Sequence, residues 1–444
     1  PSAGSDANSG KTKAVLSADG KFYSVNGNKM WITNGGFANF MTVFAKIEDD
    51  KNLTAFLVEA DSEGITLNPE EKKMGIKGSS TRQVFFNNVQ VPAENMLSER
   101  GNGFKIAINI LNIGRIKLAA GVLGGSKQSI TESVIYANER EQFGRPISKY
   151  GAIKYKLSEQ AIRTYALESA TYRASQNIED AIAALKESGM DKGQATLKGI
   201  EQFAAECAIL KVAGSECLDY CVDEAVQIYG GMGYSAESSV ERGYRDARIN
   251  RIFEGTNEIN RMLTVDMILK RAMKGELDLM GPAMKVAGEL MSIPPMDDLP
   301  EGVFAKEDLM LEGFKKTILM VAGSAVQKLM QTLGKEQEVL MSISDIAIDT
   351  YVAESTLLRV QKALINKSEE ELAPQIAMVK TLFFDLSDKI AKHAKDAIYS
   401  FAEGDERKMM LMGVKRFTKT NEINPKELRH LIAGKIIEAN EYCY

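Results

Sequence analysis

The sequence predicts an α+β protein, with a small β-barrel or β-sandwich domain, then a helical bundle, then an additional C-terminal helical domain. Three observations support this prediction. Short runs of β-branched and aromatic residues dominate up to Pro92, helical periodicity begins near Gly103, and a Pro-bearing acidic stretch interrupts it between 281 and 306. A chain of 444 residues is also too long for one core, because single cores stop growing at about 250–300 residues.

The region up to Pro92 is predicted to consist of strands and turns. Asn26-Gly27 is typical of a hairpin turn between two of the strands. The strand-like runs lie at 21–25, 41–45, 53–58 and 83–86.

Apolar residues recur at helical spacing through most of the remaining chain. Residues 187–193 contain Gly and Asp and are predicted to form a loop between two helices. The longest predicted helices cover 126–139, 152–185, 194–229, 309–333, 338–364 and 372–401. The predicted domains are a β domain at 1–100, a helical domain at 101–275, a linker at 276–306 and a C-terminal helical domain at 307–444.

The composition excludes several classes of function. The net charge is -5, from 55 Lys and Arg against 60 Asp and Glu, so the chain lacks the broad basic field of a nucleic-acid binder. Four cysteines and two histidines, without suitable spacing, predict neither a disulfide framework nor a metal site. No apolar run approaches the about 20 residues that span a bilayer, and no signal peptide is recognisable. The chain opens on Pro1, and we expect that residues upstream are missing.

The segment from Arg248 to Ile259 is the most informative for function. A helix-like stretch ends there, Gly255 permits unusual backbone angles, and Thr256 is suited to cap the next helix. Glu254 is thereby displayed on a loop, where it could face a pocket. Both histidines lie in the C-terminal third, so acid–base chemistry elsewhere would use a carboxylate, Tyr, Lys or Cys. The alternative is that Glu254 simply complements the dipole of the following helix.

Three further segments have residue types suited to a flat or phosphorylated ligand. In 227–234, a Gly-rich turn after a long helix would let the backbone approach a ligand, although Gly clusters also end helices without one. In 140–146, Arg140 could pair with a pyrophosphate and Phe143 could stack on a ring, or both could be ordinary surface residues. In 30–36, the only Trp precedes a hydroxyl and a turn, which suits either a cofactor or a core.

These four segments, together with the opening residues 1–6, resemble the flavin-dependent acyl-CoA dehydrogenase family in order and spacing. The resemblance extends to about Lys274 and implies that the helical bundle is of the acyl-CoA dehydrogenase type with FAD as cofactor. Some of the FAD-binding residues lie across a subunit interface in this family, so a homodimer is implied. The FAD-binding residues implied by the resemblance are Trp31, Ile32, Thr33, Arg140, Gln142, Phe143, Gln227, Gly230, Gly231, Thr256, Asn257 and Glu258.

The resemblance also implies a reaction. Glu254 falls on the catalytic glutamate that removes the α-proton of an acyl-CoA, while the β-hydrogen passes as hydride to flavin N5 and yields a trans-2-enoyl-CoA. Some relatives carry the base immediately before the residue that corresponds to Arg115, but this chain has Gly114 there. Electron-transfer flavoprotein is the implied electron acceptor. The implied substrate-binding residues are Ser5, Asn112, Arg115, Phe253 and Gly255.

Residues 108–115 and the extra helical domain look closest to the very-long-chain branch, which implies long-chain substrates in fatty-acid β-oxidation. The N-terminal helical domain of the family is missing. An acyl-CoA oxidase and a non-catalytic assembly or scaffold protein remain alternative readings. The acidic stretch at 287–306 opposes an anionic surface, so membrane contact is expected to be peripheral at most. We expect a cytoplasmic location in a bacterium, or the mitochondrial matrix or inner-membrane face in a eukaryote.

Overall fold

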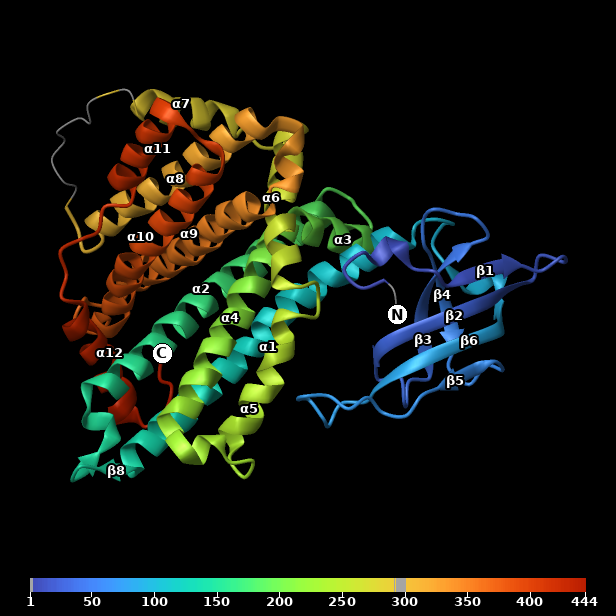
Figure 1. The fold of residues 1–444 in the computed structure, drawn as a ribbon, viewed down its shortest axis with the longest axis horizontal. Helices are drawn as coiled ribbons and strands as arrows, with labels where there is room; N and C mark the ends of the chain where they lie inside the picture. The colour runs from blue at the N-terminus through green and yellow to red at the C-terminus, as the bar shows by residue number, and fades with distance from the viewer. Residues whose placement is uncertain (1–2, 291, 293–300) are drawn as a thin grey trace. The chain divides into compact units, whose positions relative to one another are not determined.

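The computed structural model describes residues 3–290, 292 and 301–444, which divide into two units that meet in sequence at Gly114 and Arg115. The first unit contains the sheet and the second contains nearly all of the helices (Figure 1). The predicted end of the β domain at residue 100 precedes the start of helix α1 (Gly103–Glu139), which runs through the division between the units without interruption.

The first unit is built on a seven-stranded sheet with the order β5-β6-β2-β1-β3-β4-β7. All neighbouring strands are antiparallel except β1 and β3, which are parallel. Tyr23, Val25, Phe56 and Val89 belong to its apolar core. The strands are β1 (Lys13–Leu16), β2 (Phe22–Thr33), β3 (Phe40–Ile47), β4 (Thr54–Glu59), β5 (Ile65–Leu67), β6 (Thr81–Pro92) and β7 (Met96–Leu97), with the 3₁₀ turns η1 (Ala7–Ser9) and η2 (Ala93–Asn95).

The predicted hairpin turn at Asn26-Gly27 is wrong, because both residues lie inside the continuous strand β2. The register of β2 against β6 shifts between Val25 and Gly27, which marks a β-bulge. The Asn26 side chain bonds across to Asn88, accepting from its backbone N–H at 2.8 Å. Gly27 has a φ of 148°, and a Cβ there would lie 2.7 Å from the Thr12 hydroxyl oxygen. The Asn-Gly pair therefore forms a β-bulge at a point where neighbouring strands approach closely.

The second unit is helical apart from the short pair β8 (Glu141–Gln142) and β9 (Arg145–Pro146). Its helices are α2 (Gly151–Glu187), α3 (Lys192–Gln202), α4 (Ala204–Tyr229), α5 (Ser239–Ala247), α6 (Asn257–Met273), α7 (Met280–Leu290), α8 (Ala305–Leu329), α9 (Gln337–Leu364), α10 (Ala373–Phe401), α11 (Gly404–Phe417) and α12 (Pro425–Ala439), with 3₁₀ turns η3 (Ile147–Lys149), η4 (Gly230–Tyr234), η5 (Arg248–Arg251) and η6 (Met330–Lys335). The helix predicted over 194–229 is two helices, since α3 ends before Phe203 and α4 begins after it.

One apolar core joins the predicted helical domain to the predicted C-terminal domain. Ile130 of α1 and Leu157 of α2 belong to the same buried cluster as Phe314 of α8 and Phe383 of α10. The predicted linker at 276–306 is partly regular, because α7 forms within it and buries Val286 in this core. Residues 293–300, the Pro-bearing centre of that prediction, lie outside the described residues.

Helix α1 differs from the expectation that the chain has no membrane-length apolar segment. It is long and apolar enough, by length and composition, to cross a membrane, with a mean hydropathy of 1.5 over its most apolar stretch. Length and composition alone do not separate a membrane span from a core helix, since both are apolar. Only 28% of that stretch is buried in the structure.

Candidate active site

Glu254 lies on the short loop between η5 and α6, in a backbone conformation that few residues adopt. Its φ is 59°, and the φ of the following Gly255 is 82°, so two successive residues are left-handed. The predicted cap is present, because the Thr256 hydroxyl accepts a hydrogen bond from the Ile259 N–H at 3.3 Å. Such backbone strain persists only where neighbouring groups impose it.

Two buried side chains impose this conformation by binding the carbonyls of the loop. The Asn260 amide nitrogen donates to the carbonyls of Glu254, Gly255 and Thr256 at 3.3, 2.8 and 3.0 Å. The Arg115 Nε donates to the Glu254 carbonyl at 3.3 Å. Asn260 and Arg115 are 0% and 4% exposed. These hydrogen bonds hold the main chain of the loop, and none of them involves the Glu254 carboxylate.

The electrostatic surroundings of Glu254 favour a base. Burial raises the pKa of its carboxyl, while the positive charges of Arg115 and Lys211 oppose that rise. The pKa of Lys211 is itself lowered to about 8, chiefly by burial and then by repulsion from Arg115. A carboxylate with a raised pKa is better matched to proton abstraction near neutral pH than an ordinary one.

A second group of predicted residues meets at the opposite end of α4 from Lys211. Arg140, Gln142, Gly230 and Gly231 line one hollow of about 640 Å³ in the second unit, together with Tyr229 and others. Gly230 ends α4 with a φ of 59°, and a Cβ on either glycine would meet nothing within 4 Å. Backbone and a guanidinium therefore border open space, which is the arrangement that a phosphate-bearing ligand requires.

Comparison with known proteins decides the family. The chain matches the acyl-CoA dehydrogenase middle domain over residues 1–89 and acyl-CoA dehydrogenase C-terminal domains over 101–269 and 313–416. It is 43% identical over 442 residues to a probable acyl-CoA dehydrogenase of Bacillus subtilis, covering 100% of this chain and 74% of that protein. This chain belongs to the acyl-CoA dehydrogenase family. It is an enzyme of an oxidoreductase family that acts on acyl-CoA.

Two further relatives support this finding, and this chain spans only part of the length of each. The mitochondrial very long-chain specific acyl-CoA dehydrogenase of Macaca fascicularis is 40% identical over 393 residues, covering 82% of this chain and 57% of that protein. The crystal structure of an acyl-CoA dehydrogenase complexed with FAD from Bacillus anthracis has a TM-score of 0.96 and 43% identity, covering 100% of this chain and 75% of that one.

The other predicted residues of this acyl-CoA dehydrogenase fall in three places. Phe253, Glu258 and Asn257 flank the Glu254 loop in the second unit, and Asn257 is buried at the start of α6. Gln227 lies in the last turn of α4, and Phe143 is 94% exposed with a positive φ of 53°. The residues in the first unit are Trp31, Ile32 and Thr33 at the end of β2, Ser5 before η1, and the buried Asn112 in α1.

Trp31 has a conformation that the sequence does not disclose. It has a φ of 61° in a part of β2 where the pairing with β6 is irregular, and its side chain is 58% exposed. The alternative that this Trp fills the core of the first unit is therefore wrong. An exposed indole offers a flat apolar surface to a ligand.

A polar network next to the loop, which starts at the buried Lys211 and Asn257, was not predicted. The Lys211 ammonium donates to the Asn257 Oδ1 at 2.8 Å, and the Asn257 Nδ2 donates to Glu216 at 3.1 Å. Arg261 donates to Glu216 at 2.8 Å and to Asp345 of α9 at 2.7 Å. A lysine inside the apolar run Ile209-Leu210-Lys211-Val212 was the available signal, because lysine is almost never fully buried unless paired.

Proposed function

We propose that this chain binds FAD and dehydrogenates a long-chain acyl-CoA to a trans-2-enoyl-CoA, with Glu254 as the base and electron-transfer flavoprotein as the electron acceptor. The observation that supports this most is the Glu254 loop, whose carbonyls accept hydrogen bonds from Arg115 and Asn260 and whose carboxyl has a raised pKa. The names of the Bacillus subtilis and Macaca fascicularis relatives describe both proteins as acyl-CoA dehydrogenases.

The residues present fit FAD. The hollow lined by Arg140, Gln142, Gly230 and Gly231 would hold the adenine and pyrophosphate end, because it offers a guanidinium and open glycine backbone. In the first unit, Trp31 and Thr33 would contact the flavin ring, with Ile32 between them. FAD, when bound, would accept the β-hydrogen of the substrate as hydride.

The chain itself would supply the proton chemistry. Glu254 would take the α-proton of the thioester, and its raised pKa brings its basicity closer to what that transfer needs. Among the described residues, no backbone carbonyl accepts a hydrogen bond from the Glu254 N–H. That N–H would donate to the thioester carbonyl oxygen as negative charge develops there. Arg115 and Asn260 would keep the loop in position during the transfer.

The proposed partners follow the family. A homodimer is proposed because Arg140, Gly230 and Gly231 resemble residues that hold FAD partly across a subunit interface in this family. Location is proposed as cytoplasmic in a bacterium, or as the mitochondrial matrix or inner-membrane face in a eukaryote, with peripheral membrane contact at most.

The test is anaerobic mixing of the FAD-loaded protein with saturated acyl-CoAs of increasing chain length, followed by the visible absorbance of oxidised flavin. The proposal expects bleaching that is strongest with long chains, and slow oxygen consumption in aerated controls. Rapid oxygen consumption would instead establish the oxidase alternative. Bound flavin that no acyl-CoA bleaches would contradict the proposed reaction and favour the scaffold alternative.

A further inference from the structure

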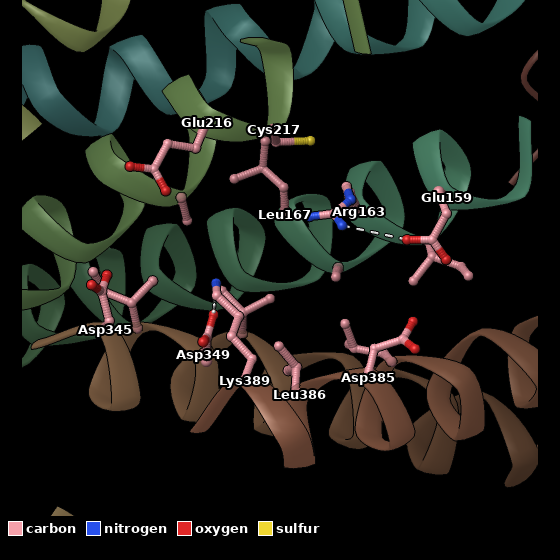
Figure 2. A pocket seen from close by; sticks show the side chains of 16 residues that line it. Glu159, Arg163, Leu167, Glu216, Cys217, Asp345, Asp349, Asp385, Leu386 and Lys389 are labelled. Atoms are coloured by element: carbon pink, nitrogen blue, oxygen red, sulfur yellow. Dashed lines mark hydrogen bonds and ion pairs between the residues drawn. The ribbon is translucent and has the colours of Figure 1, made fainter. Parts of the chain in front are cut away.

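The cavity of about 230 Å³ between α2, α4, α9 and α10 has its carboxylates paired within the protein. Figure 2 shows two of these ion pairs, Arg163 with Glu159 and Lys389 with Asp349. The carboxylates that line the cavity each have such a cationic partner; they are Glu159, Glu216, Asp345, Asp349 and Asp385. Among the lining residues that the structure describes, the cavity presents no unpaired carboxylate to a ligand. A carboxylate with a different arrangement lies in the first unit.

Glu70 lies in the loop between β5 and β6, and its carboxylate is the centre of a cluster of hydrogen bonds. Its Oε1 accepts from the Ser80 hydroxyl at 2.7 Å and from the Arg82 Nε at 2.8 Å, and its Oε2 accepts from the Thr81 N–H at 2.8 Å. These hydrogen bonds, with that of Arg82 foremost, lower the pKa of Glu70 to about 2, so the carboxylate is ionised at neutral pH. The side chain is 45% exposed, so its ion pair with Arg82 adds little stability, and what the cluster fixes is geometry.

Ser80 connects the Glu70 carboxylate to the turn that follows β2. An ionised carboxylate only accepts, so the Ser80 hydroxyl donates to Glu70. The hydroxyl oxygen then accepts from the Gly36 N–H at 3.2 Å, and the Ser80 carbonyl accepts from the Asn34 N–H at 3.0 Å. Asn34 directly follows Thr33, the last residue of β2. Glu70 thus orients the hydroxyl that holds this turn.

Gly36 packs directly against this cluster. A Cβ at position 36 would lie 2.7 Å from the Ser80 Oγ and 3.0 Å from both the Arg82 Nε and the Glu70 Oε1. These distances are shorter than van der Waals contact, so a larger residue must displace the cluster. The φ of Gly36 lies outside the left-handed region, so close packing and not backbone freedom requires glycine here.

The strand end that leads into the turn has a strained backbone. The φ of Trp31 is 61° and that of Asn34 is 62°, a region that residues other than glycine rarely occupy. The two β6 residues that donate to Glu70 pair in register with Ile32 and Thr33, which lie between them. Strained conformations persist where neighbouring groups impose them. The Glu70 cluster is such a group, because it holds both the paired strand and the turn.

We propose that Glu70 is a positioning residue for the flavin ring. It acts through Ser80 and the paired strand β6, which together hold residues 31–34 in the conformation that places the Trp31 and Thr33 side chains against the ring. This role rests on the proposed contact of Trp31 and Thr33 with the flavin. It adds to that contact a loop, between β5 and β6, in which no predicted site residue lies.

The test compares variants of the whole chain at saturating FAD. E70Q keeps the shape of the side chain but replaces one acceptor oxygen by an amide, so at least one donor of the cluster faces another donor. G36A displaces the cluster from the opposite side. E63Q, at an exposed carboxylate, and G78A, whose Cβ would meet nothing within 4 Å, are the matched controls.

We expect E70Q and G36A to shift the visible absorbance maxima of the bound, oxidised flavin and to slow its reduction by a long-chain acyl-CoA about tenfold. E63Q and G78A should equal wild type. A loss of stability alone would not move the spectrum of the folded, FAD-saturated protein. The slowing in the double variant E70Q/S80A should equal that in the more impaired single variant, because both substitutions break one connection. Additive slowing would overturn the connection through Ser80.

T33A separates this role from the proposed flavin contact. A spectrum that changes in T33A but in neither E70Q nor G36A would overturn the positioning role and leave the contact of Thr33 with the flavin standing. A spectrum that is unchanged in T33A would contradict that contact, and the positioning role would fall with it.

Discussion

Replacing Lys211 by Met should change how the stability of the second unit depends on pH. Lys211 is fully buried on α4, and its ammonium donates to the Asn257 Oδ1. Met has a similar length and no charge. After the substitution, the Ser215 hydroxyl still donates to the Asn257 Oδ1 at 3.2 Å, so no buried acceptor is left unsatisfied. The main effect should therefore come from the lost charge.

The magnitude follows from the lowered pKa of Lys211. Burial brings this pKa from 10.5 to about 8, so the folded protein loses the proton at a lower pH than the unfolded chain. Between these pKa values the unfolded chain binds more protons, and wild-type stability rises with pH. The full shift corresponds to about 3 kcal/mol, of which about 2 kcal/mol develops between pH values of about 7 and about 9.5. K211M should lack this gain.

The assay is urea unfolding at both pH values, followed by helical ellipticity, which reports the second unit because most helices lie there. K198M, at an exposed lysine of α3, is the matched control and should follow wild type. We expect the stability difference, K211M minus wild type, to fall by about 2 kcal/mol on raising the pH. A difference that stays constant, or that grows with pH, would refute the reasoning about a buried ammonium.

Three other substitutions test the support of the Glu254 loop, each by urea unfolding at neutral pH and flavin reduction by acyl-CoA. G255A should lower the free energy of unfolding by about 1–2 kcal/mol and slow flavin reduction, because the residue is left-handed and its new Cβ would lie 3.1 Å from the Asn260 amide nitrogen. Unchanged flavin reduction would mean that the loop accommodates the new Cβ. N260A should lower the free energy of unfolding by about 2–4 kcal/mol, because three loop carbonyls lose a hydrogen-bond donor. An unchanged free energy of unfolding would contradict this. D345N should lower the free energy of unfolding by about 1–3 kcal/mol, because it weakens the ion pair with Arg261. An equal decrease in D405N, at an exposed carboxylate, would contradict that explanation.

Local signals in the sequence were sufficient for parts of the site. Thr256 was expected to cap a helix and does, because a cap depends only on the residues of one turn. A Gly-rich turn was expected after a long helix, and Gly230 does follow α4, with a positive φ. The family resemblance then supplied the roles that no local pattern reveals, and the comparisons confirm that family.

Other features depend on contacts between distant segments and were therefore missed. Asn26-Gly27 has the composition of a turn, but its bulge is decided by Asn88 and Thr12 on neighbouring strands. The hydrogen bonds of Arg261 to Asp345 and Glu216 join α6 to α9 and α4, and they cannot be read from one helix alone. The helix α7 lies within the predicted linker, because its Val286 packs into the apolar core of the second unit.

The central claim is that Glu254 is the base of an acyl-CoA dehydrogenation, and one comparison tests it most directly. E254Q keeps the shape of the loop and removes the proton acceptor, while E187Q makes the same change at an exposed residue that ends α2. Both FAD-loaded variants are mixed anaerobically with a long-chain acyl-CoA, and flavin absorbance is followed. The account predicts that E254Q binds the substrate and slows bleaching by at least about 10²-fold, with E187Q equal to wild type. Bleaching in E254Q at the wild-type rate would contradict the account.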